Sequence, residues 1–161
     1  MIYSQLKEMG IVEERPAEIS EIMGLITRAE RDLATSKFLH DKDEEWAFIC
    51  AYQAMSRSAR ALIFSEGLRP KVFRGRDSQK TIVTAAGSIL GEDCKSLINK
   101  FDRMRRKHQS FMEDSGRIIS RYEAGQAIQD AVEFLGLVNG KIREKYSQMS
   151  LLNDVPQLVS K

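Results

Sequence analysis

Residues 46–64 read WAFICAYQAMSRSARALIF, an apolar and alanine-rich stretch. Its alanines predict a helix that packs on more than one side, because small side chains let neighbouring helices approach closely. The acidic cluster DKDEE at 41–45 precedes it and supplies candidate N-terminal caps, since carboxylates stabilise the positive end of a helix. Gly67, followed by Pro70, marks the end of the helix. The stretch is therefore predicted to be the central helix of a bundle.

Apolar residues at three- and four-residue steps predict further helices on both sides of this one. A helix is expected from Pro16, which suits a first helical turn, to about residue 39, and others at about 78–90, 92–112 and 120–145. Strand signals are almost absent. The predicted fold class is all-α, an up-and-down bundle of four to five helices. The apolar stripes are Ile19, Ile22, Ile26, Ala29 and Leu33; Cys94, Leu97, Ile98, Phe101 and Met104; and Ala124, Ala127, Ala131, Phe134 or Leu135, Val138 and Ile142.

A chain of 161 residues is long enough to bury one core, and it contains no internal repeat. A single bundle is predicted over residues 17–146, with terminal extensions at 1–16 and 147–161. Residues 68–77, LRPKVFRGRD, are the predicted loop, and they carry four basic side chains.

The balance of 25 basic against 23 acidic side chains gives a net charge of +2. A general electrostatic affinity for nucleic acid or lipid is not implied, so any basic site must be local. Two cysteines and two histidines without metal-ligand spacing predict neither a disulfide framework nor a metal or cofactor site. Neither a signal peptide nor a membrane span is recognisable, so a cytoplasmic protein without a membrane partner is expected.

Two consecutive stretches resemble the HEPN family of helical bundles. Residues 29–39, AERDLATSKFL, resemble the family pattern A-x-x-D-L-x-x-A, with Ser36 at the last position. The helix after the acidic turn carries AYQAM at 51–55, which matches A-Y-x-A-M, and ARALIFSEG at 59–67, which resembles A-x-A-L-x-x-x-G with one more residue before the glycine. A basic segment and a closing helix with EA at 123–124 and AVEF at 131–134 follow in the family's order, so the resemblance spans about residues 17–145.

The resemblance implies a small helical bundle that is usually dimeric. Family members act as metal-independent ribonucleases, as partners of nucleotidyltransferases in toxin–antitoxin pairs, or as silent binding modules. A homodimer is expected from the family and from the extra apolar surface of the helix at 46–64.

In the family's ribonucleases an arginine precedes a histidine by four to six intervening residues, and Arg103 and His108 match this spacing with four. A histidine that titrates near neutrality can remove the 2′-hydroxyl proton of RNA. An arginine can stabilise the negative charge that develops on the phosphate. The resemblance thus implies His108 as general base and Arg103 or Arg105 as phosphate stabiliser, with RNA or nucleotide phosphates bound by Arg105, Arg106 and Lys107.

Helix geometry leaves more than one arrangement open, because positions five apart lie about 140° around a helix. Arg103 and His108 could meet in a distorted helix or across a two-fold axis between protomers, whereas Arg105 shares the face of His108 directly. A second register also exists, since relatives read Lys-Arg-(His or Asn)-x-x-x-Tyr. There Lys107 stands where arginine is expected, and Phe111 and Met112 lack the tyrosine hydroxyl.

Three further interpretations complete the prediction. The basic segment can be a solvated face, which would make the chain a non-catalytic module that partners a nucleotidyltransferase or another protein. Arg57 and Arg60 can pair with acids at the bundle edge or join Arg105 and Arg106 in one cationic groove. Trp46 and Tyr52 are expected in the core rather than as platforms for bases.

Overall fold

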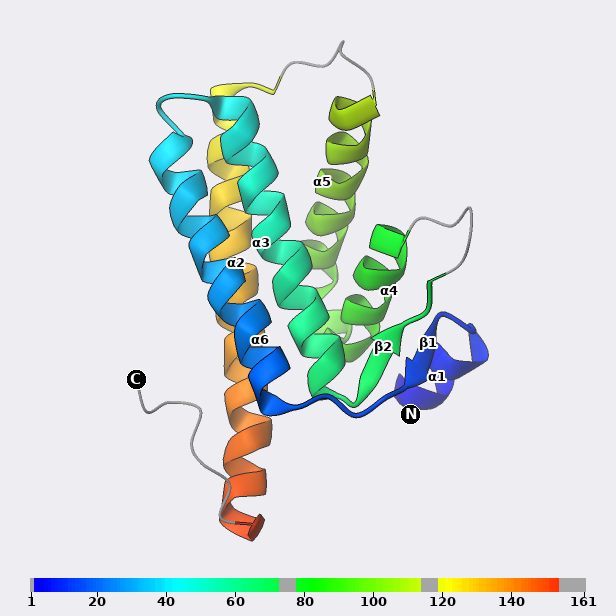
Figure 1. Cartoon of the computed structure of the whole chain (residues 1–161). Helices are drawn as coiled ribbons and strands as arrows, with labels where there is room; N and C mark the ends of the chain where they lie inside the picture. The colour runs from blue at the N-terminus through cyan, green and yellow to red at the C-terminus, as the bar shows by residue number, and fades with distance from the viewer. Residues whose placement is uncertain (1, 73–77, 114–118, 154–161) are drawn as a thin grey trace.

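The structure, a computed structural model, describes residues 2–72, 78–113 and 119–153 (Figure 1). The predicted all-α bundle is confirmed, but the described residues form six α-helices rather than four to five. In chain order the elements are α1 (Ile2–Glu8), β1 (Val12–Glu14), α2 (Ile19–Leu39), α3 (Glu44–Ser65), β2 (Leu68–Pro70), α4 (Ser78–Leu90), the 3-10 turn η1 (Glu92–Cys94), α5 (Lys95–Glu113) and α6 (Arg121–Asn153).

The central helix is α3, as the sequence predicts. Its N-cap is Asp43, whose carboxylate accepts a hydrogen bond from the Trp46 backbone N–H at 3.1 Å. Its chain reverses at Gly67, which has a φ of +72° that other residues rarely adopt. Between these ends α2, α4, α5 and α6 all pack against it (Figure 1). Most of its side chains are therefore buried within one protomer, which removes its apolar surface as an argument for a dimer.

The predicted stripes of the outer helices line the core. Ile22, Ile26 and Ala29 of α2 are buried, as are Leu97, Phe101 and Met104 of α5. The whole predicted stripe of α6 is buried, with both Phe134 and Leu135 included. The rings of Phe101, Phe134 and Tyr52 pack together in the centre, with centroids 5.2 and 6.0 Å from that of Phe101.

The loop predicted at 68–77 is wrong in its first part, because Leu68–Pro70 forms β2. It pairs antiparallel with β1, so that Glu13 lies opposite Arg69. Strands of three residues are too short to show alternation, so no strand could be predicted here. Residues 73–77 of that loop and most of the polar connection predicted at 113–116 lie outside the described residues.

Both predicted extensions contain regular structure. Leu6 of α1 and Val12 of β1 are fully buried in the main core, and α6 continues to Asn153. Trp46 differs from expectation, since half of it is exposed, whereas Tyr52 is buried as expected. No helix in the described part of the chain is long and apolar enough to cross a membrane.

Candidate functional site

The basic residues of α5 point in different directions, because the helix is regular from Lys95 to Glu113. Arg103 is exposed and lines a groove of about 490 Å³ between α5 and α6, together with Lys107 and the exposed Tyr122. Among the residues that the structure describes, Arg103 has no ion pair. Its guanidinium is therefore free to bind an anion.

The other cations of the segment are partly neutralised by neighbouring carboxylates. Arg105 is buried and donates from Nε to Asp102 Oδ1 at 2.9 Å. Arg106 is exposed and lies 3.5 Å from the other oxygen of Asp102. Lys107 forms an ion pair with Glu123 of α6. The net charge of this surface is therefore smaller than its sequence indicates.

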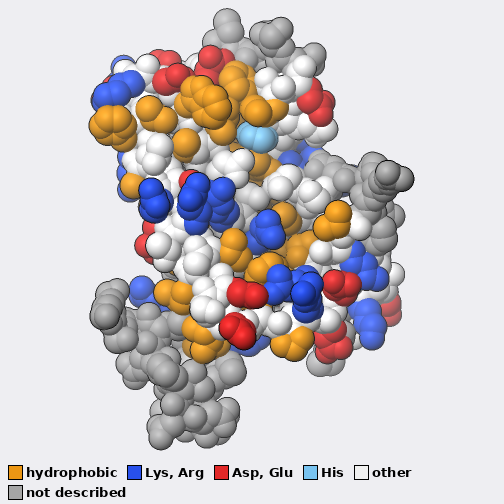
Figure 2. Space-filling model, viewed as in Figure 1, with side chains coloured by type: hydrophobic (Ala, Val, Ile, Leu, Met, Phe, Trp, Pro, Cys, Tyr) orange, Lys and Arg blue, Asp and Glu red, His pale blue; other side chains and the backbone are white. Residues whose placement is uncertain are grey.

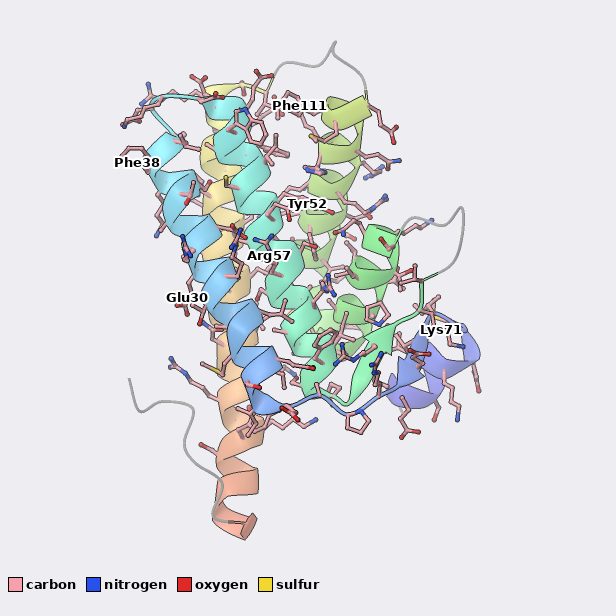
Figure 3. All side chains as sticks on the ribbon, viewed as in Figure 1. Glu30, Phe38, Tyr52, Arg57, Lys71 and Phe111 are labelled. Atoms are coloured by element: carbon pink, nitrogen blue, oxygen red, sulfur yellow. The ribbon has the colours of Figure 1, made fainter. Side chains whose placement is uncertain are left out.

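His108 lies on the opposite side of α5, against α3. Its ring stacks on Tyr52, with centroids 4.5 Å apart and planes 27° from parallel. Figure 3 shows Tyr52 and Phe111 in the region between these two helices. Burial lowers the pKa of His108 below its ordinary value of 6.5, because the charged imidazolium loses hydration.

The ring nitrogens of His108 make no hydrogen bond to any described residue. Neither nitrogen is fully enclosed, because the side chain is half-buried. A neutral imidazole without a partner is a proton acceptor that remains available to a ligand.

The structure does not bring Arg103 and His108 together within one protomer. Arg103 lines the groove towards α6, whereas His108 contacts α3. This separation follows from the regular helix, since five residues turn the side chain through about 140°. In the second register, Phe111 is half-buried against the core and Met112 is exposed.

Arg57 and Arg60 lie three residues apart on α3, and each has different surroundings. Arg57 forms an ion pair with Asp32 of α2. Arg60 is exposed and lines a separate cleft beside the β1–β2 pair. Figure 2 shows Lys and Arg side chains in a band that runs from the middle of α2 across α3 towards this pair. The single groove considered for Arg57, Arg60, Arg105 and Arg106 is thus divided among three places.

Sequence reasoning missed the partners that determine what each cation can do. Glu123 enters the prediction only as part of the closing helix, and Asp102 belongs to no motif, although Asp102 lies three and four residues before two arginines, which is a spacing that favours ion pairs. Gln79 accepts hydrogen bonds from Tyr52 at 3.0 Å and from Ser56 at 2.6 Å, and nothing in the sequence links these residues. Among the described side chains there is no group of His, Cys, Asp and Glu that could hold a metal ion.

The family assignment rests on comparison with known proteins. The model of the HEPN domain family matches residues 22–142, which is most of the chain and includes α2 through most of α6. No curated protein and no solved structure matches the chain. The helical bundle and the family match agree, and the chain belongs to the HEPN domain family.

Proposed function

We propose that this HEPN protein binds RNA and cleaves it without a metal ion, with His108 as the general base. The observation that carries the proposal is the state of this histidine. Its ring is held by the stack on Tyr52, its pKa is lowered, and its nitrogens have no partner among the described residues. It is therefore neutral at pH 7, as a general base must be.

The chemistry follows from transphosphorylation within RNA. His108 removes the proton of a 2′-hydroxyl, and the 2′-oxygen attacks the adjacent phosphorus. The bond to the 5′-oxygen breaks, that oxygen takes a proton from water, and a 2′,3′-cyclic phosphate remains. His108 then releases its own proton to the solvent. Arg103 supports this step, because a charge-assisted hydrogen bond from its guanidinium stabilises the phosphate as its negative charge increases.

The site requires two protomers. Arg103 and His108 of one chain lie on different sides of a regular helix, and Arg105, which shares the face of His108, is buried against Asp102. A homodimer with a two-fold axis near α5 would place Arg103 of one chain beside His108 of the other. Dimer formation is part of the proposal and is supported by the family assignment.

The test is cleavage of a mixed RNA substrate in excess chelator. We expect cleavage by the wild-type protein, cyclic phosphate ends on the products, and loss of activity in Arg103→Ala and in His108→Ala. Lys141→Ala is the control, because Lys141 is an exposed cation on α6 that lines neither this groove nor the depression on the other side of Arg103. Its activity should equal that of the wild type.

Mixing the two inactive variants tests the composite site directly. In an equal mixture about half of the dimers are mixed, and each carries one intact site of two, so about a quarter of wild-type activity should return. A site within one protomer would return none. No metal-independent cleavage by folded wild-type protein would contradict the nuclease, and a monomer at micromolar concentration would contradict the composite site.

A second candidate is a non-catalytic module that docks on a protein such as a nucleotidyltransferase. One observation favours it: large apolar side chains are exposed where α2 and α5 end and α3 and α6 begin. Figure 2 shows hydrophobic side chains gathered at this end of the viewed face. The exposed residues are Phe38, Trp46, Met112 and Tyr122. Co-purification with a nucleotidyltransferase that is lost in Trp46→Ala, without RNA cleavage, would support this function instead.

A further inference from the structure

The groove between α5 and α6 contains more than the exposed guanidinium of Arg103. Its volume of about 490 Å³ is that of a small-ligand site. Phe48, Met104 and Ala127, all of them buried, form the apolar part of its lining. Polar side chains from both helices complete the lining, together with Tyr122, which is 79% exposed. An apolar surface surrounded by a few polar groups suits a flat ring that carries hydrogen-bonding groups on its edge.

Asp130 of α6 is a buried carboxylate with one oxygen that is not used. The residue is 5% exposed and lines the groove. Its Oδ1 accepts a hydrogen bond from Gln126 Nε2 at 3.2 Å and lies 3.6 Å from Lys100 Nζ. Its Oδ2 is not fully enclosed, and it accepts no hydrogen bond from any residue that the structure describes. A donor that enters the groove can therefore bind this oxygen.

The two side chains that contact Asp130 also have hydrogen-bonding groups without partners. Gln126 points its amide nitrogen at Asp130, so its Oε1 is an acceptor, and no described residue donates to it. The ammonium of Lys100 is part of an ion pair but donates no hydrogen bond within the described part of the chain. Lys100 comes from α5 and Gln126 from α6, with Asp130 in contact with both. The groove thus offers a donor, a charged acceptor and a neutral acceptor in that order.

Guanine carries the complementary pattern on its Watson–Crick edge. There the O6 acceptor is followed by the N1–H donor and the N2–H donor. Cytosine has one donor and two acceptors, uracil has one donor between two acceptors, and adenine has one donor beside one acceptor. Bases in single-stranded RNA are recognised through these edges. In the groove, O6 would accept from Lys100, N1–H would donate to Asp130, and N2–H would donate to Gln126.

Tyr122 and Arg103 suit the parts of the nucleotide beyond this edge. Tyr122 lies one turn before Gln126 on α6, and its exposed ring is available to stack on a base that Gln126 binds. Arg103 lies one turn after Lys100 on α5 and has no ion pair among the residues that the structure describes. A base and the phosphates of its own nucleotide are close together in RNA, so a base beside Lys100 brings a phosphate near Arg103.

We propose that the α5–α6 groove binds a guanine base of RNA, next to the phosphate that Arg103 contacts. The inference rests on the proposed function and adds a base preference to it, so that cleavage occurs at bonds that adjoin guanosine. Because Arg103 acts together with His108 of the other protomer, one chain selects the nucleotide and the other chain removes the proton.

Binding is measured by fluorescence anisotropy with 2′-O-methyl oligonucleotides, which cannot be cleaved because the attacking hydroxyl is blocked. They are runs of uridine that differ only at the central position, which carries guanine, adenine, cytosine, uracil or hypoxanthine. Hypoxanthine is guanine without its 2-amino group. The variants are Gln126→Leu and Asp130→Asn. Gln129→Leu is the matched control, because Gln129 is an exposed glutamine of the same helix outside the groove. Thermal unfolding verifies that each variant is folded.

We expect the guanine oligonucleotide to bind about tenfold more tightly than those with adenine, cytosine or uracil. Hypoxanthine loses only the contact with Gln126 and should bind about fivefold more weakly than guanine. Gln126→Leu should therefore weaken guanine about fivefold and leave hypoxanthine unchanged. Asp130→Asn should weaken both about fivefold or more, because N1–H loses its charged acceptor. Gln129→Leu should change neither.

Cleavage by mixed dimers of Arg103→Ala and His108→Ala shows which chain selects the base. Their one intact site uses Arg103 of the His108→Ala chain, and the groove beside it belongs to the same chain. Gln126→Leu on the His108→Ala chain should therefore reduce the preference for bonds that adjoin guanosine. The same substitution on the Arg103→Ala chain should leave this preference unchanged.

Three results would overturn the proposal. One is the absence of a guanine preference in the folded wild type, whether no oligonucleotide binds or all bind alike. Another is equal weakening of guanine and hypoxanthine by Gln126→Leu. The third is metal-independent cleavage spread evenly over all nucleotides, which would refute the base preference and leave the nuclease intact. Guanine-selective binding that depends on Gln126, without cleavage, would instead confirm the groove and refute the nuclease alone.

Discussion

The stack of His108 on Tyr52 can be tested by two substitutions that distinguish the effect of the Tyr52 ring from the effect of its hydroxyl. Tyr52→Phe keeps the ring and removes the bond to Gln79. Because Gln79 still accepts a hydrogen bond from Ser56 at 2.6 Å, the loss should be at the low end of about 0.5–1.5 kcal/mol. Tyr52→Ala removes a ring that is 1% exposed and leaves a cavity, at a cost of about 3–5 kcal/mol.

The two variants should differ in their effect on the pKa of His108. In Tyr52→Phe the stacked ring still excludes water, so the pKa of His108 should stay below its ordinary value. In Tyr52→Ala water reaches the imidazole, and the pKa should rise towards 6.5. The acidic limb of the cleavage profile, where the rate falls about tenfold per pH unit, should move to higher pH with it.

Proton NMR measures this directly, because the chain has only two histidines and His108→Asn assigns the second signal. Urea denaturation gives the two stability changes, and Tyr52→Ala should lower the Tm by roughly 6–20 °C for a domain of this size. The reasoning is refuted if His108 of the wild type titrates at or above 6.5, or if Tyr52→Ala leaves its titration unchanged.

Further substitutions test the core, the backbone and the pH dependence of stability. Phe101→Ala should lower the free energy of unfolding by about 3–5 kcal/mol, whereas Phe38→Ala, at a side chain that is 65% exposed, should change it by less than about 0.5 kcal/mol, as urea denaturation would show. Gly67→Ala should cost about 1–2 kcal/mol because φ is +72°, whereas Gly136→Ala in α6, where an added Cβ meets nothing within 4 Å, should stabilise the protein by about 0.5–1 kcal/mol in the same assay. Folding lowers the pKa of His108, so below pH 6.5 the unfolded chain binds more protons than the folded chain. The free energy of unfolding should therefore decrease as the pH decreases through this range, by at most about 1.4 kcal/mol per pH unit. Denaturation across pH 5–7 should show this slope, and His108→Asn should reduce it.

The helices were predictable because their signals are local. Ala51 and Ala54 on α3, and the stripe of α6, follow helical periodicity over many turns, and each position of that stripe is buried. The pairing of β1 with β2 was not predictable, since it joins three-residue segments far apart in the chain. The prediction that Trp46 lies in the core was wrong. Tryptophan is usually buried, but this one lies in the first turn of α3, where half of it is exposed.

The candidate site was likewise predictable only in part. The separation of Arg103 from His108 follows from their spacing on one helix, and the structure agrees with that geometry. The partners come from other helices: Glu123 on α6 pairs with Lys107, and Tyr52 on α3 holds His108. The cleft beside the β1–β2 pair combines residues from β1, α3, β2 and α4, so no single stretch of sequence predicts it.

The β1–β2 pairing also determines the order in which the protein can be assembled during translation. β1 cannot pair until β2 has been synthesised, and more than fifty residues lie between Glu14 and Leu68. At about 5–20 residues per second the amino-terminal strand waits roughly 3–10 s, with Leu6 and Val12 not yet covered. Meanwhile α2 and α3 can pack locally as they emerge. The helices α2 and α3 are therefore available before the sheet can form. The cleft that Arg15 lines is completed only when β1, which precedes both helices, pairs with β2.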